Sequence, residues 1–134
     1  MRTPTAGTVR VLMTDRVVAV TAATTLEDAL RVMTECRVRH LPVMEGDRCV
    51  GMVQESDLLW TLWTHGAVAE PVGRNRIKPA PLVDPDDPMV LAAARMSEGG
   101  NDAALVTRDG SIVGIITAAD IVRYVGEHGV EQGG

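Results

Sequence analysis

The feature that most constrains this chain is a strand-to-helix junction that occurs twice, 63 residues apart. The later copy reads Gly-Ile-Ile-Thr-Ala-Ala-Asp-Ile over residues 114–121, and the earlier copy reads Gly-Met-Val-Gln-Glu-Ser-Asp-Leu over residues 51–58. In the later copy, β-forming residues precede Thr117, which is a good helix N-cap, and Asp120 follows three positions on, as in a capping box. Two copies of one supersecondary unit predict a chain built from two similar halves.

Local patterns predict the same elements in each half. Thr25 is followed by Asp28 at the third position and then by apolar residues with helical spacing, which predicts a capped helix. Turn sequences at 45–47 and 108–110 separate apolar runs, which predicts two hairpins. The predicted elements of the first half are a helical turn at 9–13, strands at 17–20, 41–44 and 48–53, a helix after Thr25 and a helix at 57–63. Those of the second half are strands at 82–83, 103–106 and 111–116, a helix that begins near Pro88 and a helix at 118–125.

Each half therefore has the order β-α-β-β-α and is too small to close a hydrophobic core alone. We predict an α/β (α+β) fold in which the two repeats pack about a pseudo-twofold axis. The first repeat is expected at residues 9–66, and the linker with the second repeat at 67–128, with a helical turn within 67–76. Residues 1–8 and 129–134 are expected to be flexible ends.

Charge and composition exclude several classes of function. The formal net charge of −5 argues against nucleic acid as a partner. No apolar run reaches the roughly 18 residues of a membrane span, and the first eight residues lack the apolar segment of a signal peptide. Cys36 and Cys49 match no metal or redox spacing and are predicted to be buried, reduced thiols. We therefore expect a cytoplasmic protein with no membrane partner and no metal site.

With these elements and motifs, the chain resembles a tandem pair of CBS domains (the cystathionine β-synthase type), also called a Bateman module. The resemblance rests on residues 25–30, on residues 40–43 and on the two junctions, and it covers roughly residues 10–126. With no other domain recognised, the chain resembles a stand-alone CBS-domain protein. The resemblance implies a regulatory module, not an enzyme, that needs no cofactor and forms a homodimer. It implies an adenosine ligand (AMP, ADP, ATP or S-adenosylmethionine) in the cleft between the repeats, and a conformational signal to a regulated protein.

The residue types at the later junction suit such a ligand. The carboxylate of Asp120 can accept hydrogen bonds from both hydroxyls of a ribose, and the hydroxyl of Thr117 lies at the same turn. The helix N-terminus offers N–H groups and a favourable dipole for phosphate. By the resemblance, residues of the first half would line the adenine and reach the phosphate. The first site is predicted to comprise Thr14, Val18, Ala19, Val38, Arg39, His40, Thr117 and Asp120.

A second site is also implied by the resemblance, but it departs from the family pattern. It is predicted to comprise Gln54, Asp57, Leu82 and Ala103. Gln54 stands where Ser or Thr is expected, Ile77 or Lys78 replaces the equivalent of Thr14, and Asp102 would repel a phosphate. If only one site is occupied, we expect the first, although a neutral or cationic adenosine ligand would tolerate Asp102.

The same residues also have purely structural interpretations. Thr117 and Asp120 are explained by a helix cap, and Arg39 by a solvated run of charges. The alternative to a ligand sensor is therefore a dimerisation scaffold with empty pockets. An enzyme is the weakest hypothesis, because the sequence contains no nucleophile with a base and no Walker-type loop. Trp60 and Trp63 lie three residues apart on a predicted helix, as core residues or as a dimer contact.

Overall fold

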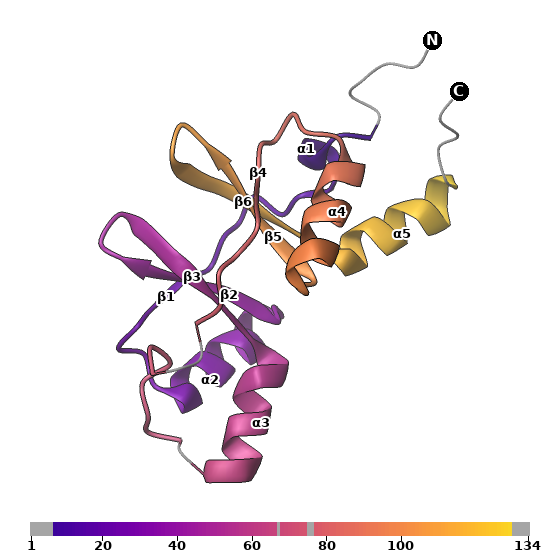
Figure 1. Ribbon diagram of the computed structural model, residues 1–134. Helices are drawn as coiled ribbons and strands as arrows, with labels where there is room; N and C mark the ends of the chain where they lie inside the picture. The colour runs from indigo at the N-terminus through magenta and orange to yellow at the C-terminus, as the bar shows by residue number, and fades with distance from the viewer. Residues whose placement is uncertain (1–6, 67, 75–76, 130–134) are drawn as a thin grey trace. The chain divides into compact units, whose positions relative to one another are not determined.

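The structure, a computed structural model, describes residues 7–66, 68–74 and 77–129 and consists of two compact units (Figure 1). Val18–Pro79 form one unit, here called the N-repeat unit. Met1–Val17 and Ala80–Gly134 together form the other, here called the C-repeat unit. Each unit contains one three-stranded sheet with helices, so the predicted α+β fold class is confirmed.

The N-repeat unit is built on the strands β1 (Val20–Thr21), β2 (His40–Glu45) and β3 (Arg48–Gln54). They lie in the order β1-β2-β3, with β1 parallel to β2 and β2 antiparallel to β3. Helices α2 (Leu26–Cys36) and α3 (Glu55–His65) complete the unit. The buried apolar core comprises Val20, Leu26, Ala29, Met33, Leu41, Val43, Val53, Leu58 and Val72.

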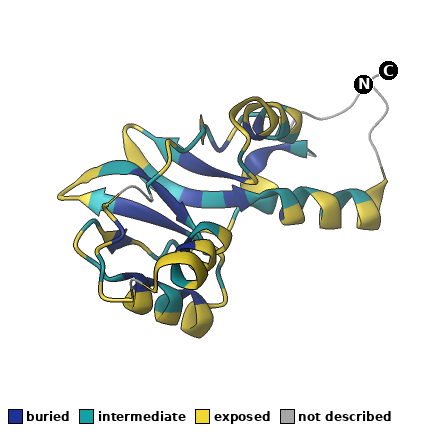
Figure 2. Cartoon of the chain, turned by 60° about the horizontal axis from the view of Figure 1, so that its bottom comes forward, coloured by how far each residue is buried: buried dark blue, intermediate teal, exposed yellow. Residues whose placement is uncertain are grey.

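The C-repeat unit repeats this arrangement and adds the short helix α1 (Val9–Leu12). Its sheet has the order β4-β5-β6, formed by β4 (Leu82–Val83), β5 (Ala103–Arg108) and β6 (Ser111–Thr117). Helix α4 (Met89–Gly99) follows β4, and helix α5 (Ala118–His128) follows β6. The core comprises Val9, Val83, Ala92, Met96, Ala104, Val106 and Ile116. Figure 2 shows buried residues in the strands and exposed residues along the helices, as expected for amphipathic elements.

Strand pairing confirms the internal repeat. Val20 pairs with Val43 in the N-repeat unit, and Val83 pairs with Val106 in the C-repeat unit, at the same offset of 63 residues. Both hairpins are present, and the register of each shifts at the equivalent point, directly after Val43 and directly after Val106. The two halves therefore share their irregularities as well as their order of elements.

The ends of the helices follow the predicted capping residues. Thr25 precedes α2, and its Oγ1 accepts the N–H of Asp28 at 3.1 Å. Pro88 is the N-cap of α4 rather than a residue of its first turn. Helix α3 ends at His65, and its C-cap is Gly66, whose φ of 62° is the left-handed conformation that glycine adopts without a steric cost.

Two of the predicted local elements are wrong. The strand predicted at 17–20 is displaced, because only Val20 and Thr21 pair with β2. The β-branched side chains that precede Val20 favour an extended chain, but an extended chain becomes a strand only where it has a partner. Within the predicted helical turn at 67–76, residues 68–74 form turns and a bridge from Pro71 to Thr25, while 67, 75 and 76 lie outside the described residues. The predicted flexibility of residues 1–6 and 130–134 also falls outside them.

Side-chain exposure corrects the prediction of two buried thiols and decides against one of the two interpretations of the tryptophans. Cys36 is exposed and Cys49 is half-buried, so the two thiols are not both core groups. Trp60 is 71% exposed and Trp63 is 83% exposed, so neither is a core residue of the chain. The dimer contact is the remaining interpretation of this tryptophan pair, and it stays a prediction.

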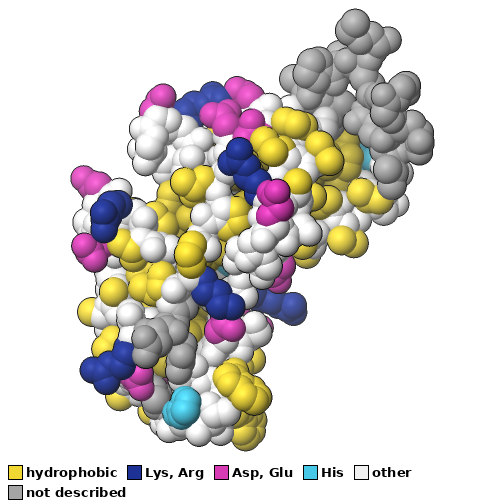
Figure 3. All heavy atoms as spheres, in the orientation of Figure 1, with side chains coloured by type: hydrophobic (Ala, Val, Ile, Leu, Met, Phe, Trp, Pro, Cys, Tyr) yellow, Lys and Arg dark blue, Asp and Glu magenta, His cyan; other side chains and the backbone are white. Residues whose placement is uncertain are grey.

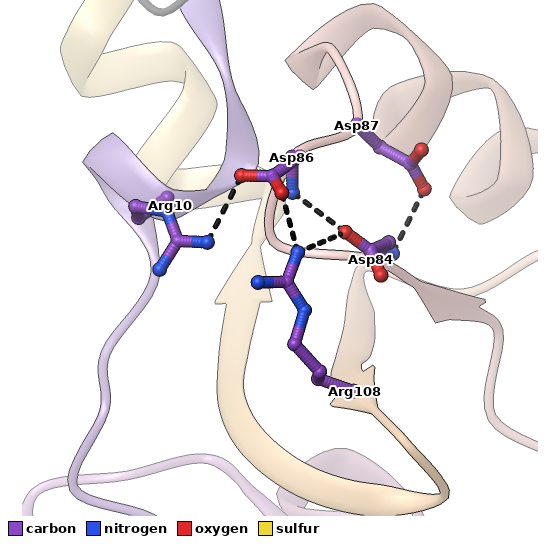
Figure 4. Close-up of polar contacts among 5 residues, drawn as sticks. All are labelled: Arg10, Asp84, Asp86, Asp87 and Arg108. Carbon is purple, nitrogen blue, oxygen red and sulfur yellow. Dashed lines mark hydrogen bonds and ion pairs between the residues drawn. The ribbon is translucent and has the colours of Figure 1, made fainter.

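Charged side chains tie α1 to the C-repeat unit. Nη2 of Arg10 lies 2.9 Å from Asp86, and Nη2 of Arg108 lies 2.9 Å from Asp84 and also contacts Asp86 (Figure 4). The N–H of Asp86 and the Arg108 guanidinium, both donating to Asp84, lower the pKa of that carboxyl. Arg10 and Arg108 likewise lower the pKa of Asp86. These four residues are called the charge cluster below.

Backbone bonds reinforce the charge cluster. The N–H groups of Val9 and Arg10 donate to the carbonyls of Asp87 and Pro85, each at 2.9 Å. Val9 is fully buried in the core of the C-repeat unit. The segment that leads from α1 toward Thr14 is therefore anchored in the unit that also contains Thr117 and Asp120.

Candidate functional site

Thr117 and Asp120 form a complete capping box at the start of α5. The N–H of Thr117 donates to Oδ2 of Asp120 at 2.9 Å, and the N–H of Asp120 donates to Oγ1 of Thr117 at 3.2 Å. The bond between Thr117 and Asp120 that the spacing predicts is thus confirmed. It fixes the rotamers of both side chains, so the carboxylate is held in one orientation.

Asp120 is unusually buried for an acidic residue. Its relative exposure is 9%, and among the residues that the structure describes it is the one buried residue with an ionisable side chain. The oxygen not used by the cap, Oδ1, accepts from Nη2 of Arg123 at 2.9 Å. An ionised carboxylate has about four lone-pair sites, so two acceptor positions remain after these two bonds.

Thr14 pairs with Ile115 of β6, the strand whose last residue is Thr117. The N–H of Thr14 donates to the Ile115 carbonyl at 2.8 Å, and the N–H of Ile115 donates to the Thr14 carbonyl at 2.9 Å. A Cβ at Gly114 would lie 2.7 Å from Sδ of Met13 and 3.0 Å from the Thr14 carbonyl oxygen. The absence of a side chain at Gly114 thus lets this segment approach the sheet, and Thr14 remains exposed.

The prediction of free N–H groups at the start of α5 is largely wrong. The N–H of Ala118 donates to the backbone carbonyl of Asp102 at 2.8 Å, and that of Asp120 is taken by Thr117. The chain itself therefore fills most of the positions that a phosphate would use at this helix end. A phosphate bound here would depend on side chains and on the helix dipole.

The other residues predicted for the first site belong to the N-repeat unit. Val18 and Val38 are half-buried and pack against its core, and Ala19 is exposed. Arg39 is 82% exposed, and its Nε lies 3.9 Å from a carboxylate oxygen of Glu55, which is a loose ion pair. His40 is half-buried at the start of β2 and interacts with another group of the chain. Whether these five residues contact a ligand stays a prediction.

The earlier junction differs from the later one in its side-chain bonds. Gln54 is the N-cap of α3 but makes no side-chain cap bond. Oδ2 of Asp57 is buried and lies 3.1 Å from Nζ of Lys78, as an ion pair outside hydrogen-bond geometry. Lys78 bridges Met52, as Thr14 bridges Ile115, so Lys78 rather than Ile77 is the structural equivalent of Thr14.

The remaining residues of the predicted second site lie in the C-repeat unit. Leu82 is 49% exposed, and its carbonyl accepts a hydrogen bond from the guanidinium of Arg95. Ala103 is fully buried at the start of β5 and presents no accessible side chain. Contacts of Leu82 and Ala103 with a ligand stay predictions.

Neither a metal-binding cluster nor a membrane-spanning helix is found among the described residues. No group of three or more His, Cys, Asp or Glu side chains within 7–66, 68–74 and 77–129 is arranged to hold a metal ion. Over the same ranges, no helix has the length and apolar character that crossing a membrane requires.

The family model of the CBS domain matches twice, at residues 8–63 and 76–127, and these matches together cover most of the sequence. The chain belongs to the CBS domain family. Its two repeats form a CBS domain pair, as the residues at both junctions indicated. Asp57 and Asp120 both lie within the matched ranges.

Curated relatives of this CBS pair are longer proteins. The chain is 30% identical over 126 residues to an uncharacterised 33.4 kDa protein in a ribosomal RNA operon of Thermofilum pendens, covering 85% of the chain and 42% of the relative. It is 30% identical over 117 residues to a homoserine O-acetyltransferase of Methanococcoides burtonii, covering 86% of the chain and 23% of that enzyme. The chain thus spans less than half the length of these relatives.

Solved CBS structures have the same fold. An uncharacterised conserved protein from Pyrococcus horikoshii is 25% identical, with a TM-score of 0.79 over 94% of this chain and 96% of that one. A CBS domain pair solved with 5′-methylthioadenosine and S-adenosyl-L-methionine is 20% identical, with a TM-score of 0.80 over 90% of this chain and 96% of that one. At 20% identity this second likeness shows the fold alone.

Sequence reasoning missed some partners of the predicted site residues. Arg123 follows Asp120 at the i,i+3 spacing of a helical ion pair, so its role was visible in the sequence. The pairing of Lys78 with Asp57 joins residues 21 positions apart and has no local signal. The charge cluster combines three separate segments and is equally invisible to local patterns.

Proposed function

We propose that this CBS pair is a regulatory module that binds an adenosine ligand, with Asp120 accepting hydrogen bonds from the ribose. The ligand class is AMP, ADP, ATP or S-adenosylmethionine. The observation that carries the proposal is the burial of Asp120 within a capping box, where its side chain is only 13% exposed. A cap requires no burial, because the equivalent Asp28 at the start of α2 caps its helix with a side chain that is 55% exposed.

The geometry of Asp120 suits a ribose. Its carboxylate is held by Thr117 and Arg123, and two of its lone-pair sites remain for the adjacent hydroxyls of the sugar. Hydrogen bonds to an ionised acceptor are about twice as strong as bonds between neutral groups. Thr14 and Thr117 add two hydroxyls near the same end of β6. The CBS pair solved with 5′-methylthioadenosine and S-adenosyl-L-methionine supports this ligand class.

The regulatory part of the proposal is a population shift. A ligand that contacts both repeats would favour one arrangement of them over others, and a regulated protein would respond to that arrangement. We expect the module to act as a homodimer that uses α3, where hydrophobic side chains gather on the surface (Figure 3). The alternative function is a dimerisation scaffold that binds no ligand, and it would leave the burial of Asp120 without a functional role.

The test is a calorimetric titration of three proteins with AMP, ATP and S-adenosylmethionine. Asp120→Ala removes the proposed ribose acceptor. Asp28→Ala is a matched control, because Asp28 also follows a capping threonine by three residues and also pairs with an arginine three residues later, at 2.6 Å. Both variants therefore lose a first-turn carboxylate and one helical ion pair.

The proposal expects wild type and Asp28→Ala to bind one of these compounds with similar affinity. Asp120→Ala should weaken that binding at least tenfold, the equivalent of one lost charge-assisted hydrogen bond of about 1.5–3 kcal/mol. Equal affinity of Asp28→Ala and Asp120→Ala would remove Asp120 from the site. Absence of binding to wild type by every compound would favour the scaffold.

A further inference from the structure

The two repeats differ at the equivalent carboxylate. In the C-repeat unit, Asp120 is held by the cap of Thr117, and the crossing segment presents the small neutral side chain of Thr14. In the N-repeat unit, the equivalent Asp57 has no capping partner at Gln54, and the crossing segment presents the ammonium of Lys78. Each carboxylate has a cationic partner, but that of Asp120 is Arg123 on the same helix, whereas that of Asp57 is Lys78 on the segment paired with β3, where the C-repeat unit has a threonine.

We propose that Lys78 is a built-in competitor for Asp57 that selectively weakens ligand binding at this carboxylate. The proposal rests on the proposed function of Asp120, because it assigns the same ribose chemistry to the equivalent position. The protein would then have two sites of unequal affinity, and the ligand would bind first at the site of Asp120.

The position of Lys78 makes it an effective competitor. Its backbone is fixed to β3, because its N–H and carbonyl exchange hydrogen bonds with Met52 at 2.9 and 2.8 Å. Its Nζ lies 3.1 Å from Oδ2 of Asp57, and that oxygen is buried. A group tethered this closely acts at a high effective concentration, whereas a ligand must arrive from solution.

The chemistry also favours the internal partner. A ribose offers neutral hydroxyls to the carboxylate, whereas Lys78 offers a full positive charge, and the contact between two ions is the stronger one. The side chains of Lys78 and Asp57 are 51% and 30% exposed, so solvent screens the pair, and it is worth less than a buried pair. Removing Lys78 should therefore tighten binding at Asp57 roughly fivefold, the upper range for partly exposed ion pairs.

The backbone of Lys78 is packed closely against Gly51 of β3, so it cannot carry the Lys78 side chain away from Asp57. A Cβ at Gly51 would lie 2.5 Å from the Lys78 carbonyl oxygen and 2.5 Å from Cγ2 of Ile77. Ile77 in turn packs against the core of the N-repeat unit. Only the side chain of Lys78 is free to leave Asp57, so competition takes place between its ammonium and the ligand.

The experiment uses the full chain in an Asp120→Ala background, which removes the proposed first site. AMP, ATP and S-adenosylmethionine are titrated into Asp120→Ala, into the double variant with Lys78→Thr and into the double variant with Lys78→Arg. Threonine copies the residue at position 14, and arginine keeps the charge as the matched control. Lys78→Gln is a second neutral variant in case threonine prevents folding, and thermal melts confirm that each protein is folded.

The inference expects Lys78→Thr to bind at least one compound roughly fivefold more tightly than its Asp120→Ala parent, while Lys78→Arg shows no gain. Adding Asp57→Ala should abolish the gain. The inference is overturned if Lys78→Thr binds no better than the parent, if it binds more weakly, or if the gain persists without Asp57. Failure of the proposed function is a separate result, since it appears as equal binding by wild type and Asp120→Ala.

Discussion

Replacing Gly51 by alanine tests how tightly the segment before β4 is seated on the N-repeat unit. The new Cβ would lie 2.5 Å from Cγ2 of Ile77 and 2.5 Å from the carbonyl oxygen of Lys78, closer than real Cβ atoms approach. Gly51 also has a φ of 149°, in a region that only glycine occupies readily. The backbone strain costs about 1–3 kcal/mol, and the overpacking costs about 1–3 kcal/mol. We therefore predict that Gly51→Ala lowers the free energy of unfolding by about 2–6 kcal/mol.

Chemical denaturation followed by circular dichroism measures this loss, and two other glycines calibrate it. Gly46→Ala shares a positive φ of 63° but has no heavy atom within 4 Å of its new Cβ, so it should cost only about 1–2 kcal/mol. Gly114→Ala meets Sδ of Met13, the end of a flexible side chain, at 2.7 Å and should fall between the two. If Gly51→Ala costs no more than Gly46→Ala, the segment is not seated as described.

Three further predictions concern a cap, the charge cluster and the tryptophans. Thr117→Ala removes the N-cap of α5 and should cost about 1 kcal/mol of stability by denaturation, and an unchanged stability would contradict a role for this cap in folding. Because the N–H of Asp86 and the Arg108 guanidinium lower the pKa of Asp84, the stabilisation that these contacts give is present above about pH 4 and is lost as pH falls further. Asp84→Asn should therefore be less stable than wild type at pH 7, and the difference should shrink by pH 3; a constant difference would contradict this sign. Sedimentation should show that replacing Trp60 and Trp63 by serine converts a dimer to a monomer, and an unchanged dimer would place the interface elsewhere.

Much of this fold is predictable from the sequence because its signals are local. The cap at Thr25, the cap at Thr117 and the hairpin turns each depend on residues within a few positions of one another. The internal repeat then relates one half to the other. The same local signal, a carboxylate three residues after a capping threonine, marks Asp120 in the sequence.

The errors arise where local preference and long-range contact disagree. The valines before Val20 favour a strand, but their segment has no strand pairing, and β1 contains only two residues. The ion pair between Lys78 and Asp57 depends on a chain crossing that no local pattern encodes. The N–H of Ala118 is satisfied by the carbonyl of Asp102, from the residue just before β5, which explains why the helix end is less open than predicted.

The most direct test of the central claim is a thermal-shift measurement on wild type, Asp120→Ala and Asp28→Ala with AMP, ADP, ATP and S-adenosylmethionine. A ligand that binds only the folded chain stabilises it by about 2.7 kcal/mol at a concentration of 100 times its Kd. We predict that one of these compounds raises the Tm of wild type and of Asp28→Ala by several degrees and raises that of Asp120→Ala by about half as much or less. An equal rise in all three proteins, or no rise in wild type, would contradict a ligand site built on Asp120.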